Sequence, residues 1–179
     1  METITRHKKR LIQIGIVTLN LTLFFSVFSE PVQALHLNWA TYQNARFGYD
    51  LEYPESLFGT PQESDNGDGW SSSSPDGAYR LRVFGGHNIM NDTAQSLLQE
   101  FLTYAKENGG TVEDIQSRGD EWFAVTFRSG ESDRAVMCVV VNEDVTAQFE
   151  LIYPDSEAKR LAPAIQRMTG NLTLARPPL

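Results

Sequence analysis

The sequence is poor in the residues that build disulfides, thiolate metal sites and imidazole chemistry. Its 179 residues include one cysteine and three histidines. A lone thiol cannot form a disulfide within the chain, so no such cross-link can stabilise the fold in an oxidising compartment. Cys138 lies in the apolar run 136–141, and a free cysteine behaves as a small hydrophobe. The pattern predicts a buried, unreactive thiol in the middle of a strand.

Clustered basic residues are also missing from most of the chain. The formal charge is −8, and it becomes −10 without residues 1–34, which hold four basic and two acidic residues. After those residues, Lys and Arg form no cluster with interleaved aromatic residues. A surface this acidic repels phosphate backbones and anionic lipid headgroups. We therefore expect no nucleic acid among the partners, and no membrane binding once a leader is removed.

The N-terminus has the pattern of a secretory signal peptide. Its parts are a basic stretch (6–10), an apolar run (11–28), Pro31 and the small-residue site Val32-Gln33-Ala34. This order predicts cleavage before Leu35, a signal peptide over 1–34 and a single α+β domain over 35–179. The product would be periplasmic or secreted. The apolar run is also long enough to cross a bilayer, so an uncleaved anchor is the alternative.

Hydrophobic periodicity predicts strands and helices along the rest of the chain. Residues 47–53 alternate between apolar and polar side chains, as in a half-buried strand. Further extended segments are expected at 57–60, 70–73, 78–85, 111–118, 121–129, 133–142 and 145–153. Helical periods predict helices over 92–108, capped by Asp92, and over 156–169, where Pro163 should kink or restart the helix.

The order of these elements predicts an α+β fold. Because the strand connections are short, we expect a mainly antiparallel sheet of about six to seven strands, flanked by helices on both faces. Residues 135–141 are apolar on both sides of their strand, so something must pack on each side. Trp122 and Phe123 are neighbours in a strand and must face opposite ways. Both faces of the sheet are therefore expected to be covered, at least in part.

The start of this domain carries a family resemblance. The aromatic pattern consists of Tyr42-x-Asn44-x-x-Phe47-Gly48-Tyr49-x-Leu51-x-Tyr53-Pro54. With the element order that follows, it resembles the PsbP/Mog superfamily, which includes the extrinsic P protein of photosystem II. The resemblance implies an antiparallel sheet between helices, and an accessory or binding role rather than an enzymatic one. None of that family's functional residues can be matched to positions here.

Two acidic turns are the first candidate for a metal site. They contain Asp65, Asn66, Asp68 and Asp76. With Asp65 first, the third and fifth positions of a calcium loop are glycine and the twelfth is Asp76 instead of glutamate. Ordinary turn chemistry accounts for these residues. We therefore expect no metal site, and we expect no cofactor.

His87 and Trp70 are the candidate ligand-binding residues. His87 lies in the glycine-rich loop 85–88, where a histidine can act as a general base or a ligand, and Trp70 follows the first acidic turn. The serines at 71–74 lack the G-x-S-x-G pattern of a nucleophile elbow. Two functions follow. The first is an exported accessory or binding protein of the cell envelope, whose partner is an envelope protein or a small ligand. The second is a small hydrolase or ligand-binding enzyme that uses the loop around Trp70 and His87.

The first prediction concerns processing of the leader. The exported protein should begin at Leu35, because the site at 32–34 fits signal peptidase and Pro31 ends the apolar segment. Mass spectrometry of the exported protein measures this directly. An intact N-terminus recovered in the membrane fraction would contradict it and favour the anchor.

Overall fold

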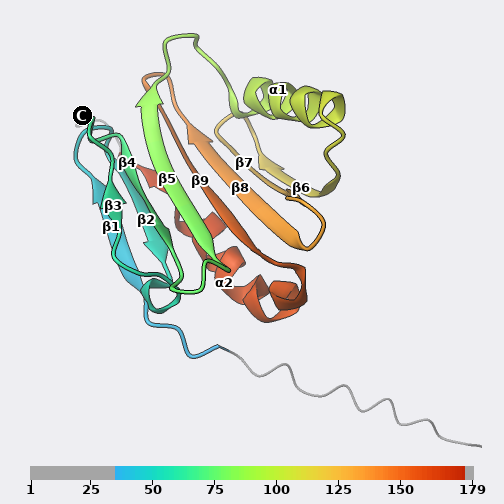
Figure 1. Cartoon of the computed structure of the whole chain (residues 1–179). Helices are drawn as coiled ribbons and strands as arrows, with labels where there is room; N and C mark the ends of the chain where they lie inside the picture. Colours follow the sequence, from blue (N-terminus) through green and yellow to red (C-terminus); the bar gives the residue numbers. More distant parts are fainter. Residues whose placement is uncertain (1–34, 176–179) are drawn as a thin grey trace, which may run out of the picture. The chain divides into compact units, whose positions relative to one another are not determined.

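The computed structural model describes residues 35–175, which form two antiparallel sheets and two α-helices (Figure 1). The expected signal peptide lies outside the described residues. The small sheet has the order β1 (Ala40–Asn44), β2 (Tyr49–Tyr53) and β10 (Thr173–Leu174). The large sheet has the order β3 (Gln62–Glu63), β4 (Gly69–Ser73), β5 (Arg80–His87), β9 (Val145–Pro154), β8 (Asp133–Val141), β7 (Trp122–Arg128) and β6 (Val112–Arg118). The helices are α1 (Ala94–Glu107) and α2 (Ala158–Asn171).

The seven-stranded sheet confirms the predicted α+β class with a mainly antiparallel sheet. Hairpins join β6 to β7, β7 to β8 and β8 to β9, while β5 pairs with β9 across more than fifty residues of sequence. Between β5 and β6 the chain passes through α1 and reaches the opposite edge of the sheet. The sequence patterns did not predict β1, β3 or β10.

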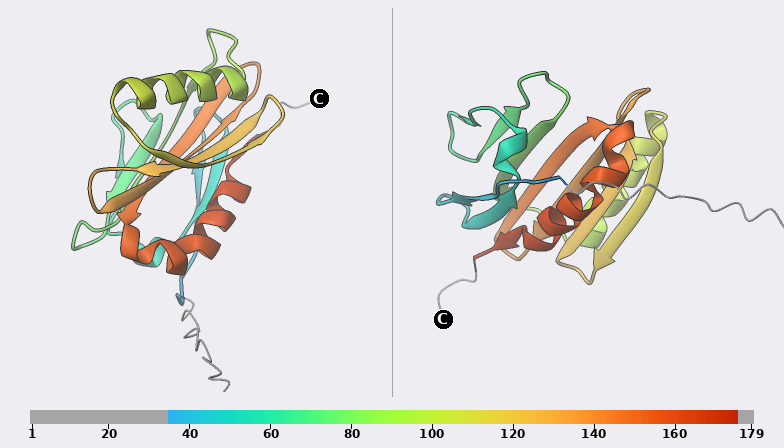
Figure 2. Two further views of the ribbon diagram at one scale, coloured as in Figure 1. Left: turned by 90° about the vertical axis from the view of Figure 1, so that its right-hand side faces the viewer. Right: turned by 90° about the horizontal axis from the view of Figure 1, so that it is seen from below.

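Strand β8 is covered on both faces, as its apolar pattern predicts. On one face Cys138 and Val136 pack in a core that includes Leu161 and Met168 of α2. On the other face Val139 and Val141 pack with Ala94 and Leu98 of α1. Trp122 belongs to the first core and Phe123 to the second. The two helices therefore lie on opposite sides of the large sheet (Figure 2), and we name its sides the α1 face and the α2 face.

The small sheet packs on the α2 face through a layer of aromatic side chains. Tyr49 and Leu51 of β2 are fully buried against β4 and β5, which confirms the alternation predicted for 47–53. The Tyr49 ring lies directly over Gly85, where an added Cβ would come within 2.7 Å of a ring carbon. Glycine at 85 thus allows this close approach between the two sheets.

Three local predictions differ from the structure. Thr93 caps α1, with reciprocal hydrogen bonds to Ser96, while the carboxylate of Asp92 accepts from the Ser96 hydroxyl. Leu57, the first residue of the segment expected to be extended at 57–60, instead ends a 3₁₀ turn, Glu55–Leu57. Helix α2 continues through Pro163 without a break, although proline removes the hydrogen bond to the Lys159 carbonyl. Lys159 and Pro163 both lie on the exposed side of α2, where water can satisfy that carbonyl.

The second prediction concerns Cys138. Its side chain is fully buried, and burial raises the pKa of the thiol to about 12. A thiol reagent should therefore label it only after unfolding. Its Sγ lies 3.8 Å from the Thr169 carbonyl, and the shorter Cβ–Oγ bond of a serine would leave a hydroxyl farther from that acceptor. We expect Cys138→Ser to lower the free energy of unfolding by about 1–3 kcal/mol.

Denaturant unfolding of Cys138→Ser and Cys138→Ala separates the polar cost from the loss of packing. Both variants remove the sulfur, but only serine adds a hydroxyl. Serine should be the less stable of the two. Fast labelling of the native protein, or a serine variant as stable as wild type, would contradict the burial argument.

Candidate functional site

An open groove runs between α2 and the β6–β7 edge of the large sheet, on the α2 face. We name it the α2 groove. Its walls come from β6, β7, β8, β9 and α2, and its volume of about 670 Å³ lies within the range of small-molecule sites. Its lining residues are Glu113, Asp114, Gln116, Ala124, Thr126, Arg134, Val136, Tyr153, Ala158, Ala162, Ile165, Gln166 and Thr169.

Secondary-structure periods place these residues in one cavity. On α2 the lining positions are spaced by three or four residues, which brings them to one side of a helix. On β7 and β8 they are spaced by two and share the α2 face. Small side chains line both sides of the groove, with Ala158 and Ala162 on the helix and Ala124 on the sheet. Because none of them is long enough to fill the space, the groove stays open.

A network of two arginines and two carboxylates lies at one end of the α2 groove. The Arg128 Nε lies 2.6 Å from the nearer Glu113 oxygen, and Arg134 Nη1 lies 3.2 Å from the other. Arg128 Nη1 also contacts Asp155 at 3.2 Å, and Arg134 donates to the second oxygen of Asp155. The four charges cancel, so the network orders this end of the groove without giving it a net charge.

Tyr153 is a largely buried residue whose hydroxyl, a hydrogen-bond donor, lines the α2 groove. Its side chain is 98% buried, as only 2% of the residue is exposed. Burial raises the pKa of its hydroxyl, which therefore stays protonated at neutral pH. None of the hydrogen bonds found within residues 35–175 involves this hydroxyl, and its oxygen is not among the fully buried atoms without a partner, so it is accessible from the groove. The hydroxyl is thus free to donate to a molecule in the groove.

The chemistry of the α2 groove suits an uncharged ligand. Val136 and Ile165 offer apolar contacts, while Gln116, Gln166 and Thr126 offer amide and hydroxyl groups. The arginine charges are already paired with carboxylates. A ligand with an apolar body and a carbonyl or hydroxyl oxygen could therefore use both parts of the lining, and it would bring no charge that has to lose its water.

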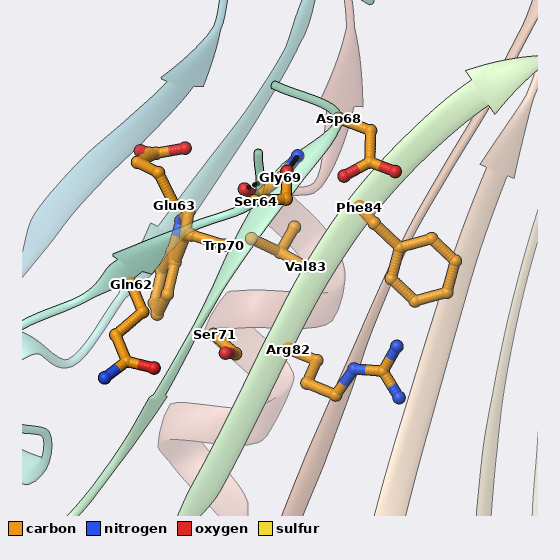
Figure 3. A pocket seen from close by; sticks show the side chains of 10 residues that line it. All are labelled: Gln62, Glu63, Ser64, Asp68, Gly69, Trp70, Ser71, Arg82, Val83 and Phe84. Atoms are coloured by element: carbon orange, nitrogen blue, oxygen red, sulfur yellow. Dashed lines mark hydrogen bonds between the residues drawn. The ribbon is translucent and has the colours of Figure 1, made fainter. Parts of the chain in front are cut away.

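Trp70 lies in the aromatic layer between the two sheets. Its ring is 3% exposed and packs against Tyr53 and Tyr42, with ring centroids 4.9 and 5.6 Å away. Its Nε1 is, among the described residues, the one buried side-chain nitrogen or oxygen without a hydrogen-bond partner. Trp70 also borders a hollow of about 240 Å³, in which Glu63 of β3 and Arg82 of β5 stand on either side (Figure 3).

His87 is exposed at the end of β5, and its ring packs edge-on against Phe47 at 5.2 Å. Trp70 pairs with Val83 across the β4–β5 ladder, four residues before His87. Four residues of strand span about 13 Å. The structure therefore places Trp70 and His87 on the same face of the sheet but does not bring them together, because Tyr49 and Phe47 lie between them over Gly85.

The polar side chains of the two acidic turns form hydrogen bonds within the turns themselves. Asn66 donates to Asp68 and also accepts from the Asp68 backbone, and Asp76 accepts from the Ser74 hydroxyl and the Ala78 backbone. In the part of the chain that is described, no three His, Cys, Asp or Glu side chains are grouped so as to hold a metal ion. The indole of Trp122 donates to the Thr169 carbonyl at 3.1 Å.

Sequence reasoning missed the α2 groove. It predicted an apolar stripe on the last helix, and Leu161 and Met168 of that stripe are indeed buried. Ala158, Ala162 and Ile165 belong to the same stripe but face the groove. The signal in the sequence was the small size of these alanines, which only becomes informative once α2 is known to lie opposite Ala124.

Comparison with solved structures identifies the fold. The solution structure of cyanobacterial PsbP (CyanoP) from Synechocystis sp. superposes with a TM-score of 0.60 and 11% identity, over 92% of this chain and 99% of that one. LpqN of Mycobacterium tuberculosis, described as involved in cell envelope biogenesis, gives a TM-score of 0.50 and 14% identity, over 79% and 93%. No protein-family model and no curated protein sequence matches the chain.

The described domain is therefore an α+β domain with the PsbP-like fold. This agrees with the resemblance drawn from the aromatic pattern at 42–54 and the order of elements. At 11% and 14% identity the likeness concerns the fold, and function has to be argued from the site. None of the described helices is both long and apolar enough to span a membrane.

The third prediction concerns the charge network of the α2 groove. Loss of water around Asp155 raises the pKa of its carboxyl, but hydrogen bonds from Arg134 and Arg128 outweigh this and hold that pKa below its ordinary value. A carboxyl whose pKa is lower in the folded protein than in the unfolded one stabilises the fold at any pH above its unfolded pKa, which is near 4. This stabilisation is lost as the pH falls through the pKa of the folded protein. Asp155→Asn should therefore flatten the fall in melting temperature below about pH 4.

The control is Asp65→Asn, which removes one carboxylate outside the network. Thermal unfolding from pH 7 to pH 2 measures all three proteins. The control should follow the wild-type curve. If Asp155→Asn loses stability with acid as steeply as wild type does, then the pairing of Asp155 does not stabilise the groove.

Proposed function

We propose that this protein is an exported, non-enzymatic accessory protein of the cell envelope that binds an uncharged small ligand in the α2 groove. The observation that carries the binding role is the free hydroxyl of Tyr153, a donor that lines a cavity of ligand size. A molecule bound in the groove would displace water from this hydroxyl and supply an acceptor in its place.

Three further observations support an accessory role in the envelope. The N-terminal pattern of basic stretch, apolar run and small-residue site is typical of exported chains. The two similar structures are named as a PsbP protein and as a protein of cell envelope biogenesis, and neither name specifies an enzyme. In the α2 groove the two arginines pair with Glu113 and Asp155, while the third acidic residue, Asp114, lies outside this network and accepts a hydrogen bond from Gln116. The groove lining holds no histidine or lysine to act with Asp114 as an acid–base pair.

The hollow beside Trp70 is the second candidate site. It is favoured by one observation, the buried indole N–H of Trp70 without an acceptor. The corresponding function is that of a small hydrolase or ligand-binding enzyme around Trp70 and His87. An active site using both residues would have to extend over about 13 Å of strand. This distance makes the α2 groove the stronger candidate.

The fourth prediction tests which site binds. A set of uncharged alkyl and aryl amides is titrated into residues 35–179 labelled with ¹⁵N, and backbone amide shifts are followed by NMR. Shifts should gather at Ala124, Thr126, Val136 and Ile165. Tyr153→Phe removes only the hydroxyl and should raise the Kd roughly two- to tenfold, because a net hydrogen bond is worth about 0.5–1.5 kcal/mol.

Ala162→Trp is the blocking variant. Ala162 is exposed on α2 and lines the groove, so an indole there should fill the space without disturbing the core. The amides should no longer bind to this variant. Shifts at the Trp70 indole N–H and at His87 would instead favour the second candidate. If no resonance moves for any amide, the proposed binding role is wrong.

A further inference from the structure

The loop between β5 and α1 carries the most exposed apolar pair of the described domain. Ile89 is 82% exposed and Met90 is 76% exposed. The loop projects beyond the end of the large sheet (Figure 1). Single exposed apolar residues need no explanation, but two adjacent aliphatic side chains on a projecting turn form a compact contact surface. We name residues 88–92 the apolar tip.

The apolar tip is held rigidly from beneath. Asn88 is only 7% exposed, and its side-chain amide donates to the carbonyls of Asp92 at 2.9 Å and Asn142 at 2.8 Å. Its side-chain oxygen accepts from the Asp92 backbone at 2.8 Å. Asn91 closes the turn in the left-handed region, with a φ of 54°. Ile89 and Met90 are thus presented by an ordered turn, which lowers the entropic cost of binding a partner.

The surroundings of the apolar tip are acidic. A hollow of about 270 Å³ beside it is lined by Asp92, Asp120, Glu121 and Glu143, and no Lys or Arg lines it. Asp144, in the neighbouring β8–β9 turn, is exposed as well. An apolar contact beside a cluster of carboxylates matches a partner with the opposite charge. Anionic lipid is repelled by this cluster, and a second copy of the chain would bring the same carboxylates against it.

We propose that the apolar tip docks onto a protein whose surface has an apolar pocket bordered by lysine or arginine. Ile89 and Met90 enter the pocket, while the surrounding carboxylates select the basic border and speed the encounter. This surface lies at the end of the sheet where β5 and β8 finish, and it shares no lining residue with the α2 groove. It is therefore independent of the proposed ligand site.

The fifth prediction tests this docking by photo-cross-linking. The full chain, with p-benzoylphenylalanine in place of Met90, is produced in the cells that normally make the protein and irradiated. The expected product is an adduct with another protein, whose cross-linked peptide contains apolar residues next to Lys or Arg. The same photoreactive residue in place of Tyr104, which is 64% exposed on α1, is the positional control and should not give this adduct.

Two variants test whether docking needs the acidic residues and whether it is independent of the α2 groove. Glu143→Lys with Asp144→Lys should lower the yield of the adduct roughly tenfold, because like charges across an interface suppress association. Ala162→Trp, in the α2 groove, should leave the yield unchanged, so failure of the groove proposal is distinguishable from failure of this one. The proposal is overturned by an adduct with lipid, an adduct with a second copy of this chain, a yield that charge reversal does not alter, or no adduct at Met90.

Discussion

Strand β8 is apolar on both faces, and the placement of both helices and of the small sheet follows from this. A strand that is apolar on one side needs one covering layer, but Val136 and Cys138 on one side and Val139 and Val141 on the other need two. Helix α1 covers one face, and α2 together with the small sheet covers the other. The chain must therefore place its second helix across the sheet from the first.

Both candidate surfaces follow from this division. On the α2 face, helix α2 and the three-stranded sheet together cover the large sheet. Neither of them places large side chains over the outer part of β6 and β7. The α2 groove is the space that they leave. On the other face, the chain connects the end of β5 to the start of α1, and this connection contains the apolar tip. The groove and the tip thus arise from covering opposite faces.

Local patterns predicted most strands and both helices, because alternation and helical period depend on neighbours in the sequence. The pattern at 47–53 and the two-sided run at 135–141 were sufficient for this. The pairing of β5 with β9, and the separate sheet that adds β10 to β2, join segments far apart in the chain and leave no local signal. Trp70 was predicted to meet a ligand, and the structure places it beside a hollow but largely within the aromatic layer.

The candidate site could not be predicted for a related reason. The α2 groove depends on the sizes of Ala124 and Ala162, which lie on different elements and face one another only in the folded chain. Tyr153 looked like one more apolar residue of an alternating strand. Its free hydroxyl becomes notable only when the groove and the hydrogen bonds of the folded chain are both known.

A crystal of residues 35–179 soaked with one of the uncharged amides would show whether the α2 groove binds a ligand. We expect density for the amide between Val136 and Ile165, with its carbonyl oxygen within hydrogen-bond distance of the Tyr153 hydroxyl. The proposed site is wrong if α2 lies closer to β7 and closes the groove, or if Tyr153 donates to a protein group and the amide is found elsewhere.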